Sequence, residues 1–411
     1  MKFTELGLHD SLLEGIHSMG YAEATPIQSQ SMPVILQGQD LMGIAQTGTG
    51  KTAAFLLPVL HRIASHPEWT GVKALIVVPT RELAQQIDQA VEAYSYFTGA
   101  SSMAIYGGGD GMDFYNEKTA IQQGVDIVIA TPGRLLSHLN VGADFSQIRF
   151  LILDEADRMM DMGFQPDLIR IIKKVNADRQ TLMFSATMPD KILDFAQSLL
   201  RDPVTVNIAL NKPAKGVQQT AYVVHDGQKM PILVDLLGGY ANESVIIFSS
   251  TKHNVLALYK ALKTKLPGVG YISSDLEQDA REQMLLDYRS GKVNILVATD
   301  VMSRGIDIAG IRLVVNYDVP GDAEDYVHRV GRTARADKRG EAITFVGPSD
   351  QGRFHKIEVL IGSAVDKAVI EERYGPAPEY NPRSSGGGKP RHGDRNKKFS
   401  RKPHFKGPKK S

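Results

Sequence analysis

The chain has 411 residues, of which 42% are hydrophobic and 23% are charged, a composition typical of globular proteins. It contains no cysteine, which excludes disulfides, iron–sulfur clusters and thiolate zinc sites and favours a reducing, cytoplasmic location. The sequence has no run of about 18 apolar residues, so no membrane span is expected, and its length predicts two to three domains.

The net charge of +1 conceals a basic C-terminal segment. Residues 376–411 contain seven Lys and four Arg against two acidic residues, a net of +9, which leaves −8 for the rest of the chain. The segment is rich in Pro, Gly and Ser and has no periodic apolar face, so we expect a disordered basic tail. The tail either binds an acidic polymer, with Tyr380, Phe399 and Phe405 stacking on bases, or serves as a solubilising terminus.

Short apolar runs and amphipathic stretches alternate along the first half of the chain. This alternation predicts a parallel sheet with helices on both faces. The strand candidates are Leu41–Ile44, Ala74–Val78, Met103–Ile105, Ile127–Ala130, Phe150–Leu153 and Thr181–Phe184, with helical patterns such as Glu82–Phe97 and Leu168–Val175 between them.

The second half repeats this rhythm after Asn207–Gly216, a stretch without periodicity that is typical of a linker. Its strand candidates are Gln219–Val224, Val245–Phe248, Val293–Ala298, Leu313–Asn316 and Ala342–Val346, and its helix candidates include Met230–Leu237, Val255–Leu262 and Ala280–Tyr288. The sequence therefore predicts an α/β fold with two tandem domains, at residues 1–209 and 217–361, followed by the disordered tail at 376–411.

A glycine-rich loop, AQTGTGKT at residues 45–52, follows a predicted strand and opens a predicted helix. Backbone N–H groups around Gly48 and Gly50 can surround phosphate oxygens, and the positive end of the helix dipole assists them. In such a loop Lys51 reaches the β- and γ-phosphates and Thr52 holds Mg²⁺. The strict pattern has Gly where Ala45 stands, but the strand–loop–helix context still predicts a nucleoside triphosphate site.

Four further polar segments also follow predicted strands. The acidic tetrad Asp154–Asp157 is suited to bind Mg²⁺ through water and to orient an attacking water. The others are Pro79–Glu82, Thr131–Arg134 and Ser185–Thr187. Because ligands of open α/β sheets bind beyond the carboxyl ends of the strands, we expect all five segments to share one edge of one sheet.

These segments resemble the motifs of the DEAD-box ATP-dependent RNA helicases, as do ATDVMSRGID at 298–307 and HRVGRTAR at 328–335. The tetrad that gives this family its name, D-E-A-D, is the sequence of residues 154–157. The resemblance covers about residues 3–361, with the motifs in the expected order. It implies two RecA-like domains with parallel sheets that close over ATP and RNA together.

The resemblance also implies roles for individual residues around ATP and Mg²⁺. Phe3 would stack on the base, with simple core packing as the alternative for Phe3 and Tyr21, and the Gln28 amide would pair with adenine. Arg332 and Arg335 match arginine fingers that reach the γ-phosphate only on closure. The implied catalytic residues are Lys51, Asp154, Glu155, Arg332 and Arg335; the nucleotide-binding residues are Phe3, Gln28, Gln46, Thr47, Gly48, Thr49, Gly50, Lys51, Thr52 and Asp307; and the metal ligands are Thr52 and Asp154.

RNA contacts and coupling follow from the same resemblance. The implied RNA-binding residues are Arg81, Gly108, Thr131, Gly133, Arg134, Thr251, Gln278, Arg281 and Thr299, and the coupling residues are Ser185, Thr187 and His328. Ser185 and Thr187 are expected to hydrogen-bond to the tetrad. Because none of the RNA-binding side chains is placed to read base edges, recognition should be independent of sequence. The chain departs from the family's usual residues at Ser273–Ser274, Met302–Ser303 and Ala334, which affects RNA contacts rather than the ATP site.

The expected function is that of an RNA helicase, an RNA-dependent ATPase that unwinds or remodels short RNA duplexes locally. Its expected partner is structured or double-stranded RNA, with ribonucleoprotein and ribosome-assembly partners left open and no membrane involved. The alternatives are an ATP-gated RNA clamp or annealing chaperone with little unwinding and, less favoured by the tetrad, a DNA helicase.

Overall fold

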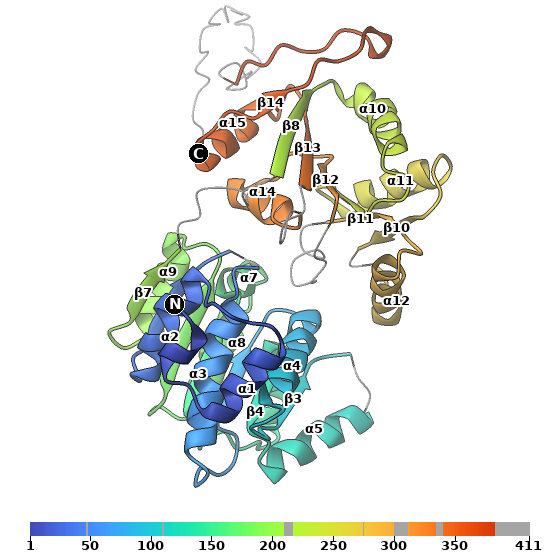
Figure 1. Cartoon of the computed structure of the whole chain (residues 1–411). Helices are drawn as coiled ribbons and strands as arrows, with labels where there is room; N and C mark the ends of the chain where they lie inside the picture. The colour runs from blue at the N-terminus through green and yellow to red at the C-terminus, as the bar shows by residue number, and fades with distance from the viewer. Residues whose placement is uncertain are drawn as a thin grey trace, which may run out of the picture.

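The computed structural model describes residues 1–46, 48–108, 111–208, 217–273, 275–299, 311–333 and 340–382, which form two α/β domains, one above the other in Figure 1. Within these residues each domain has a seven-stranded sheet, and all neighbouring strands are parallel. The predicted tandem parallel α/β fold is thereby confirmed. The expectations for Thr47, Asp307, Arg335, the side chain of Gln278, the segment 209–216 and the tail from residue 383 fall outside the described residues.

The first sheet has the strand order β3-β4-β2-β5-β6-β1-β7. Its strands are β1 (Leu41–Ile44), β2 (Ala74–Val77), β3 (Ser102–Ile105), β4 (Ile127–Ala130), β5 (Phe150–Leu153), β6 (Gln180–Ser185) and β7 (Val204–Asn207). The helices around it are η1 (Phe3–Leu6), α1 (Asp10–Ser18), α2 (Pro26–Leu36), α3 (Lys51–Ser65), α4 (Arg81–Ser95), α5 (Gly111–Gln123), α6 (Pro132–Asn140), α7 (Ala156–Asp161), α8 (Gln165–Ile172) and α9 (Asp190–Leu199).

Alternate residues of each central strand pack into two different cores. In β2, Ile76 joins the cluster beneath α1 to α4, whereas Leu75 and Val77 join the cluster beneath α6 to α9. Side chains on a strand alternate between the two faces, and both faces of a parallel sheet are covered. This explains why the central strands are continuous apolar runs in the sequence and why helices lie on both sides.

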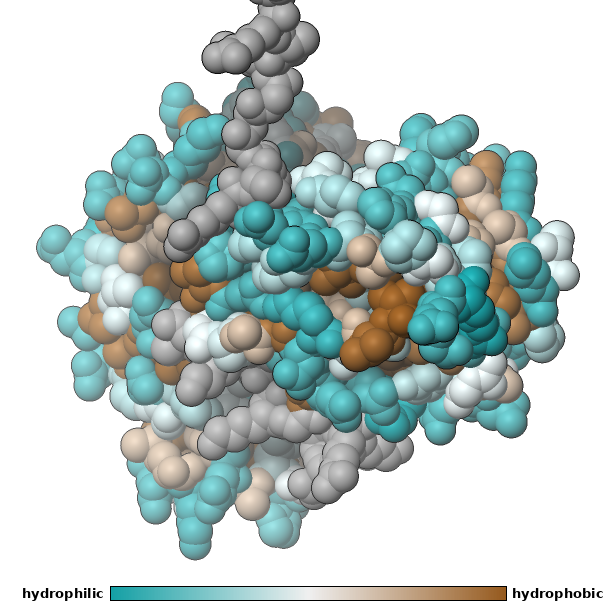
Figure 2. Space-filling model, turned by 90° about the horizontal axis from the view of Figure 1, so that it is seen from above, coloured by the Kyte–Doolittle hydropathy of each residue, from teal (hydrophilic) through white to brown (hydrophobic). Residues whose placement is uncertain are grey.

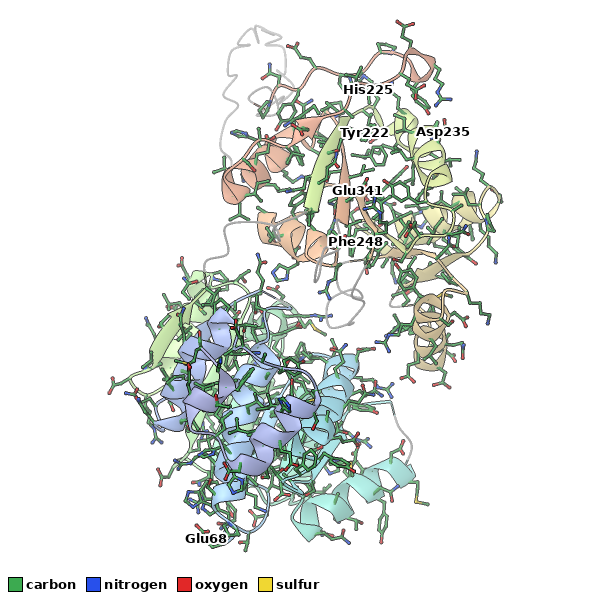
Figure 3. The ribbon with its side chains drawn as sticks, viewed as in Figure 1. Glu68, Tyr222, His225, Asp235, Phe248 and Glu341 are labelled. Carbon is green, nitrogen blue, oxygen red and sulfur yellow. The ribbon has the colours of Figure 1, made fainter. Side chains whose placement is uncertain are left out.

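The second sheet has the order β10-β11-β9-β12-β13-β8-β14. Its strands are β8 (Val217–Val223), β9 (Val245–Phe248), β10 (Val269–Ile272), β11 (Ile295–Ala298), β12 (Leu313–Asn316), β13 (Gly340–Val346) and β14 (Asp366–Lys367). The helices are α10 (Asp226–Gly238), α11 (Lys252–Lys263), α12 (Gln278–Arg289), α14 (Ala323–Val330), α15 (Gln351–Ile361) and η2 (Glu372–Tyr374). Phe248, at the carboxyl end of β9, lies on the side of this domain that faces the first domain (Figure 3).

The strands that the sequence did not predict are the sheet edges β7, β10 and β14. In β7 only Val206 is fully buried, and in β10 buried and half-buried positions alternate around Gly270. An edge strand buries less apolar surface, so its hydrophobic run is shorter and less distinct than that of a central strand.

The outer surface carries hydrophobic residues in separate patches among hydrophilic ones, as the view from above shows (Figure 2). Among the described residues, no helix combines the length and the apolar character needed to cross a membrane.

The second domain continues beyond α15 through a segment that we call the C-terminal strap, residues 362–382. Strand β14 of the strap pairs with β8, and Gln351 donates from Nε2 to the Glu379 carbonyl at 2.8 Å. The Tyr380 hydroxyl donates to Glu358 Oε2 at 2.6 Å, and the Tyr380 ring meets Phe354 edge-on at 6.3 Å. The expectation that Tyr380 belongs to a free tail and stacks on bases is therefore wrong, because its ring is used in packing.

Replacing Tyr380 by Ala should loosen the strap. The variant loses a hydrogen bond to a carboxylate and an aromatic contact, so the second domain should be destabilised by roughly 2 kcal/mol. Hydrogen exchange measured by mass spectrometry should become faster in residues 362–382. Tyr96→Ala, which removes a tyrosine that is 79% exposed in the first domain, is the matched control. Unchanged exchange in the strap of Tyr380→Ala would contradict its anchoring role.

Candidate active site

The loop between β1 and α3 has the geometry of an anion site. Gly48 and Gly50 adopt the left-handed conformation, with φ of 82° and 92°. Helix α3 begins directly afterwards at Lys51, so its unpaired N–H groups end in the loop. Lys51 is 6% exposed and donates from Nζ to the Ala45 carbonyl at 2.7 Å, while Thr49 donates from Oγ1 to the Gln46 carbonyl at 2.7 Å. Thr52, half-buried, is the second residue of α3.

Gln28 joins the N-terminal helices to this loop. Its Oε1 accepts from the Thr25 N–H at 2.9 Å, and its Nε2 donates to the Gly50 carbonyl at 3.1 Å. A Cβ on Gly50 would lie 2.4 Å from Gln28 Nε2, so only glycine permits this approach. Both ends of the Gln28 amide are thus engaged within the protein, and the pairing with adenine requires an exchange of partners.

The two aromatic residues expected near the base have opposite environments. Phe3 is 3% exposed and belongs to the core of the first domain, whereas Tyr21 is 45% exposed. Their rings meet edge-on with centroids 6.5 Å apart. Core packing, the alternative considered for both residues, therefore describes Phe3 and not Tyr21.

The acidic tetrad begins where β5 ends. Asp154 is 3% exposed, and its Oδ1 accepts from the Glu155 N–H at 2.9 Å. Burial raises the pKa of Asp154 to about 6, while the nearby charge of Lys51 lowers it and that of Glu155 raises it. Glu155 has a φ of 52°, a left-handed conformation that costs a residue with a side chain about 1–3 kcal/mol. Its Oε2 accepts from Arg158 Nη1 at 3.1 Å, which holds the carboxylate at the start of α7.

The donor set is suited to Mg²⁺. Thr52 and Asp154 supply hard oxygen atoms, and the described residues contain no group of three or more acidic or histidine side chains that would form a complete cage. Mg²⁺ characteristically binds through one or two protein oxygens and retains water and phosphate ligands.

Asp157, the last residue of the tetrad, holds the segment after β6. Its Oδ2 accepts from the Thr187 N–H at 2.9 Å, from the Thr187 hydroxyl at 3.0 Å and from the Ala186 N–H at 3.2 Å. Ser185 donates from Oγ to the Thr187 carbonyl at 2.6 Å. The structure therefore contains the expected hydrogen bonds between Thr187 and the tetrad, whereas the Ser185 side chain bonds to the Thr187 carbonyl.

A cavity of about 580 Å³ brings side chains of both domains together. Glu155, Asp157 and Thr187 line it from the first domain, and Asp322 and His328 line it from the second. Helix α14, which carries His328, ends two residues before Arg332, a side chain that is 6% exposed. Two of the three expected coupling residues thus lie in the same cavity as Glu155.

Two of the expected RNA-binding residues of the first domain are in contact. The Arg81 guanidinium lies over the Tyr106 ring, 4.6 Å from its centroid. Gly108 has a φ of 96°, and a Cβ there would lie 2.8 Å from Arg81 Nη1. Gln85 donates to the Tyr106 hydroxyl at 2.8 Å, which fixes the ring beneath the guanidinium. These residues follow the carboxyl ends of β2 and β3.

Arg134 is held inside the domain. Thr131 and Gly133 lie at the start of α6, but Arg134 donates from Nε to Glu117 Oε2 of α5 at 2.7 Å. The same Glu117 oxygen lies 2.6 Å from His138 Nε2, and Glu117 is 7% exposed. We call Glu117, Arg134 and His138 the α5–α6 clamp. The sequence did not point to Glu117, because helix α5 buries little besides Glu117 and Ile121 and gives no clear periodic signal.

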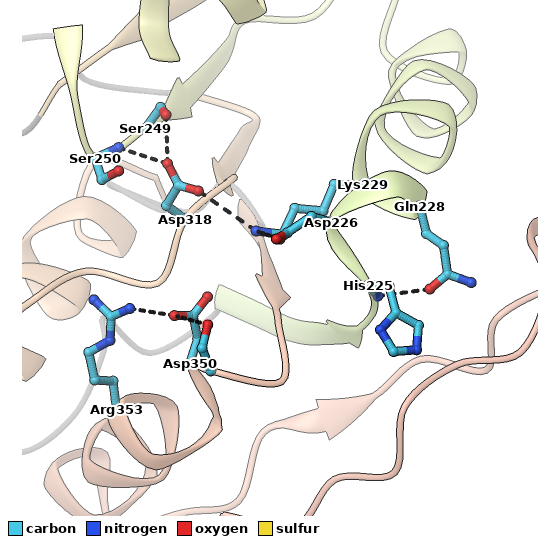
Figure 4. A network of polar contacts seen from close by, with 10 residues as sticks. His225, Asp226, Gln228, Lys229, Ser249, Ser250, Asp318, Asp350 and Arg353 are labelled. Carbon is cyan, nitrogen blue, oxygen red and sulfur yellow. Dashed lines mark hydrogen bonds and ion pairs between the residues drawn. The ribbon is translucent and has the colours of Figure 1, made fainter. Parts of the chain in front are cut away.

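In the second domain, a network of polar contacts supports the segment that follows β9 (Figure 4). Asp318 Oδ2 accepts from the Ser249 hydroxyl at 2.6 Å and from the Ser250 N–H at 2.9 Å, and Lys229, 5% exposed, lies 3.7 Å from Asp318 Oδ1. Burial acts to raise the pKa of Asp318, but these hydrogen bonds and the charge of Lys229 lower it overall. Thr251 caps α11 by accepting from the Asn254 N–H at 3.1 Å.

The other expected RNA-binding residues of this domain follow two neighbouring strands. Thr299 comes directly after β11, and Arg281 is half-buried on α12, which follows β10. Sequence reasoning missed Asp318 and Lys229; the only available signal was the position of Asp318 just after a strand, which resembles that of the tetrad.

Comparison with known proteins agrees with this geometry. The profile of the DEAD/DEAH box helicase family matches residues 25–195, and that of the helicase conserved C-terminal domain matches residues 228–337. The ATP-dependent RNA helicase CshA of Listeria monocytogenes is 43% identical over 359 residues, covering 87% of this chain and 68% of that protein. The DEAD-box ATP-dependent RNA helicase CshA of Geobacillus kaustophilus is 41% identical over 358 residues, covering 87% of this chain and 76% of that protein.

Solved structures give the same result. S. cerevisiae Dbp5 bound to RNA and ADP BeF3 is similar with a TM-score of 0.81 and 31% identity, covering 89% of this chain and 95% of that one. The DEAD-box helicase Mss116 bound to ssRNA and UDP-BeF has a TM-score of 0.79 and 27% identity, covering 90% and 80%. The tandem RecA-like domains and the loop before α3 define a nucleotide-driven helicase. The chain belongs to the DEAD-box family of ATP-dependent RNA helicases.

Neutralising Glu117 should destabilise the first domain. In Glu117→Gln the half-buried Arg134 loses its counter-ion, so the free energy of unfolding should fall by about 3 kcal/mol. Urea unfolding followed by the fluorescence of Trp69, the single tryptophan of the chain, measures this domain. Glu92→Gln, on the exposed face of α4, is the control.

A double-mutant cycle separates the clamp from an unrelated effect. Adding Arg134→Met removes the orphaned charge, so Glu117→Gln/Arg134→Met should lose less stability than the sum of the two single variants. Additive losses would contradict the α5–α6 clamp.

Proposed function

We propose that this DEAD-box ATP-dependent RNA helicase opens or remodels short RNA duplexes locally, without reading base sequence. The observation that carries the proposal is the cavity shared by Glu155, Thr187 and His328, because it joins the nucleotide side of the first domain to the second domain. A change in the relative position of the domains would then alter the surroundings of the tetrad. ATP hydrolysis and the closure of the two domains would be coupled in this way.

The roles proposed for the nucleotide site follow from charge and position. Lys51 and the N-terminus of α3 would neutralise the β- and γ-phosphates, and Glu155 would orient the attacking water. Thr52 and Asp154 would hold Mg²⁺, which supplies further positive charge to the phosphates. Arg332 and Arg335 would approach from the second domain, which makes turnover depend on closure. The remaining nucleotide contacts are proposed at Gln28, Gln46, Thr47, Gly48, Thr49, Gly50 and Asp307, and the buried Phe3 supports this site from the core.

The proposed RNA surface consists of loop and helix-start residues at the carboxyl edges of the two sheets. Small residues such as Gly108 and Gly133 expose backbone N–H groups, and Arg81 presents charge, a combination that suits phosphates and sugars. The binding of RNA by Dbp5 and Mss116 supports this assignment. Within the α5–α6 clamp, Arg134 would hold Thr131 and Gly133 in place. In the second domain, the Asp318 network would hold Thr251 in place in the same way. The other RNA contacts proposed there are Gln278, Arg281 and Thr299.

We propose that the two domains span residues 1–209 and 217–361, with the strap attached to the second domain, and that the protein is located in the cytoplasm.

Glu155→Gln should retain ATP and RNA binding but block hydrolysis, because the neutral amide does not activate water. The variant should therefore release RNA more slowly than the wild type in the presence of ATP. Lys51→Ala should lose turnover through weaker phosphate binding, and Glu372→Gln, an exposed residue of the strap, should behave like the wild type. Stopped-flow release of fluorescent RNA, measured beside ATPase and duplex-unwinding assays, reports each step.

Two outcomes of these assays would overturn parts of the proposal. Wild-type turnover in Lys51→Ala would contradict the nucleotide site. Robust RNA-dependent ATPase without strand separation in the wild type would favour the ATP-gated clamp or annealing chaperone over local unwinding.

The basic tail should strengthen RNA binding without changing the chemistry. Residues 383–411 contain eleven Lys and Arg and one Asp, a net of +10. Removing them while keeping the strap should weaken RNA affinity and flatten its salt dependence, by roughly 0.7 in the log–log slope for each phosphate of a single strand that the tail neutralises. A chain of equal length with these eleven residues replaced by Gln is the control for tail length. Equal affinities and slopes in all three proteins would leave the tail as a solubilising terminus.

A further inference from the structure

A second cavity lies at the opposite edge of the first sheet, where the strands begin. It has a volume of about 650 Å³ and is bordered by the residues that precede or open β1, β5, β6 and β7, which are adjacent in the sheet. A four-residue strand spans about 13 Å, so the length of the sheet separates this cavity from the loop before α3. Glu68, the neighbour of Trp69 in the cavity wall, lies at the end of the first domain remote from the second (Figure 3).

Four arginines from separate segments line this cavity, which we call the arginine pocket: Arg62, Arg149, Arg179 and Arg201. Within the described part of the chain, none of them has a carboxylate within ion-pair distance, in contrast to Arg134 and Arg158. The Nε atoms of Arg62 and Arg179 are buried without a hydrogen-bond partner among the described residues. The pocket thus concentrates four guanidinium groups that form no direct ion pair among the described residues.

Three aspartates also line the pocket, which leaves a net formal charge of +1 (four Arg against three Asp), but none of them forms an ion pair with these arginines. Asp40 is 7% exposed, and its two oxygens accept from the Thr181 N–H and the Arg201 N–H, each at 2.8 Å. Asp178 and Asp202 are exposed. Burial and the neighbouring Arg201 lower the pKa of Arg179, although Asp40 opposes this change. A bound anion would relieve the repulsion between the guanidinium groups.

We infer that the arginine pocket is a binding site for phosphate groups, separate from the ATP site and from the RNA surface at the carboxyl edge. A planar guanidinium group can donate two parallel hydrogen bonds to the oxygens of one phosphate. The negative charge of a phosphate also allows several guanidinium groups to bind it at once. The volume accommodates a ligand as large as a nucleotide or two successive phosphates of an RNA strand. The Trp69 ring is stacked on His66 at 4.4 Å and lies 5.7 Å from the Arg149 guanidinium, so it forms a wall of the pocket and leaves recognition to the arginines.

Trp69 provides a direct test, since it is the only tryptophan in the chain. Inorganic tripolyphosphate, added to the full-length protein without Mg²⁺, should change the Trp69 emission saturably. The double variant Arg149→Gln/Arg201→Gln removes two exposed arginines of the pocket. It should raise the tripolyphosphate concentration that gives half of the full emission change at least tenfold. Arg170→Gln, an arginine on the surface of α8 whose side chain is 70% exposed, is the matched control. Lys51→Ala should keep the full response, which separates the arginine pocket from the ATP site.

A second arm identifies the source of the phosphate. If RNA is the source, a single-stranded 12-mer should also change the emission, and the double variant should lower the log–log salt slope of RNA binding by roughly 1.4. If the source is a free phosphate compound, tripolyphosphate alone should give the response. An unchanged emission, equal responses in wild type and double variant, or an equal response to polyglutamate would overturn the proposal. ATP turnover in the double variant should equal that of the wild type, since the pocket lies at the other edge of the sheet.

Discussion

The common direction of the strands is the constraint on which the rest of the structure depends. Because neighbouring strands are parallel in both sheets, every segment that follows a strand emerges at the same edge. This brings Lys51, Asp154 and Thr187 together although more than 130 positions separate the first from the last. In the second domain the same rule places Ser249, Thr299 and Asp318 at one edge. The topology of the two sheets thus determines where the candidate active site lies, and the individual side chains determine its local geometry.

The local structure at this edge is held by internal contacts that involve the very groups expected to meet ligand. Asp154 is buried beside Lys51, Glu155 has a left-handed backbone, and Asp157 binds three donors from the segment after β6. Strain and buried charge persist only where the surrounding structure determines them fully. Two parallel strands, β5 and β6, provide that rigidity, since they pair along Phe150–Leu153.

The sequence predicted those features that depend on local pattern. Central strands such as β2 and β5 are unbroken apolar runs, and the loop before α3 has a recognisable spacing of glycines, so the fold class and the prediction of a nucleoside triphosphate site at this loop followed from them. Features that depend on contacts between distant segments were not predictable. Glu117 lies on a helix with little periodicity, and its partner Arg134 was predicted to bind RNA. Tyr380 was assigned to the tail because its docking partners, Phe354 and Glu358, are more than 20 positions away. Gln28 was predicted to be part of the site, but its bond to Gly50 has no sequence signal.

The contacts of Lys51 and Gln28 have a consequence for the energetics of nucleotide binding. Lys51 donates to the Ala45 carbonyl and Gln28 donates to the Gly50 carbonyl, so each group already has a partner inside the loop. A ligand that takes over either group replaces one hydrogen bond by another, and the net gain of that exchange is small compared with the gain from a free donor. If Arg332 and Arg335 act as proposed, more of the favourable free energy of ATP binding comes from contacts made only when the second domain supplies these arginines. A nucleotide that contacts both domains shifts the equilibrium toward the closed arrangement. The size of this shift is set by the difference between its affinities for the closed and the open arrangement. The internal partners of Lys51 and Gln28 therefore favour coupling of nucleotide binding to closure over tight binding to the first domain alone.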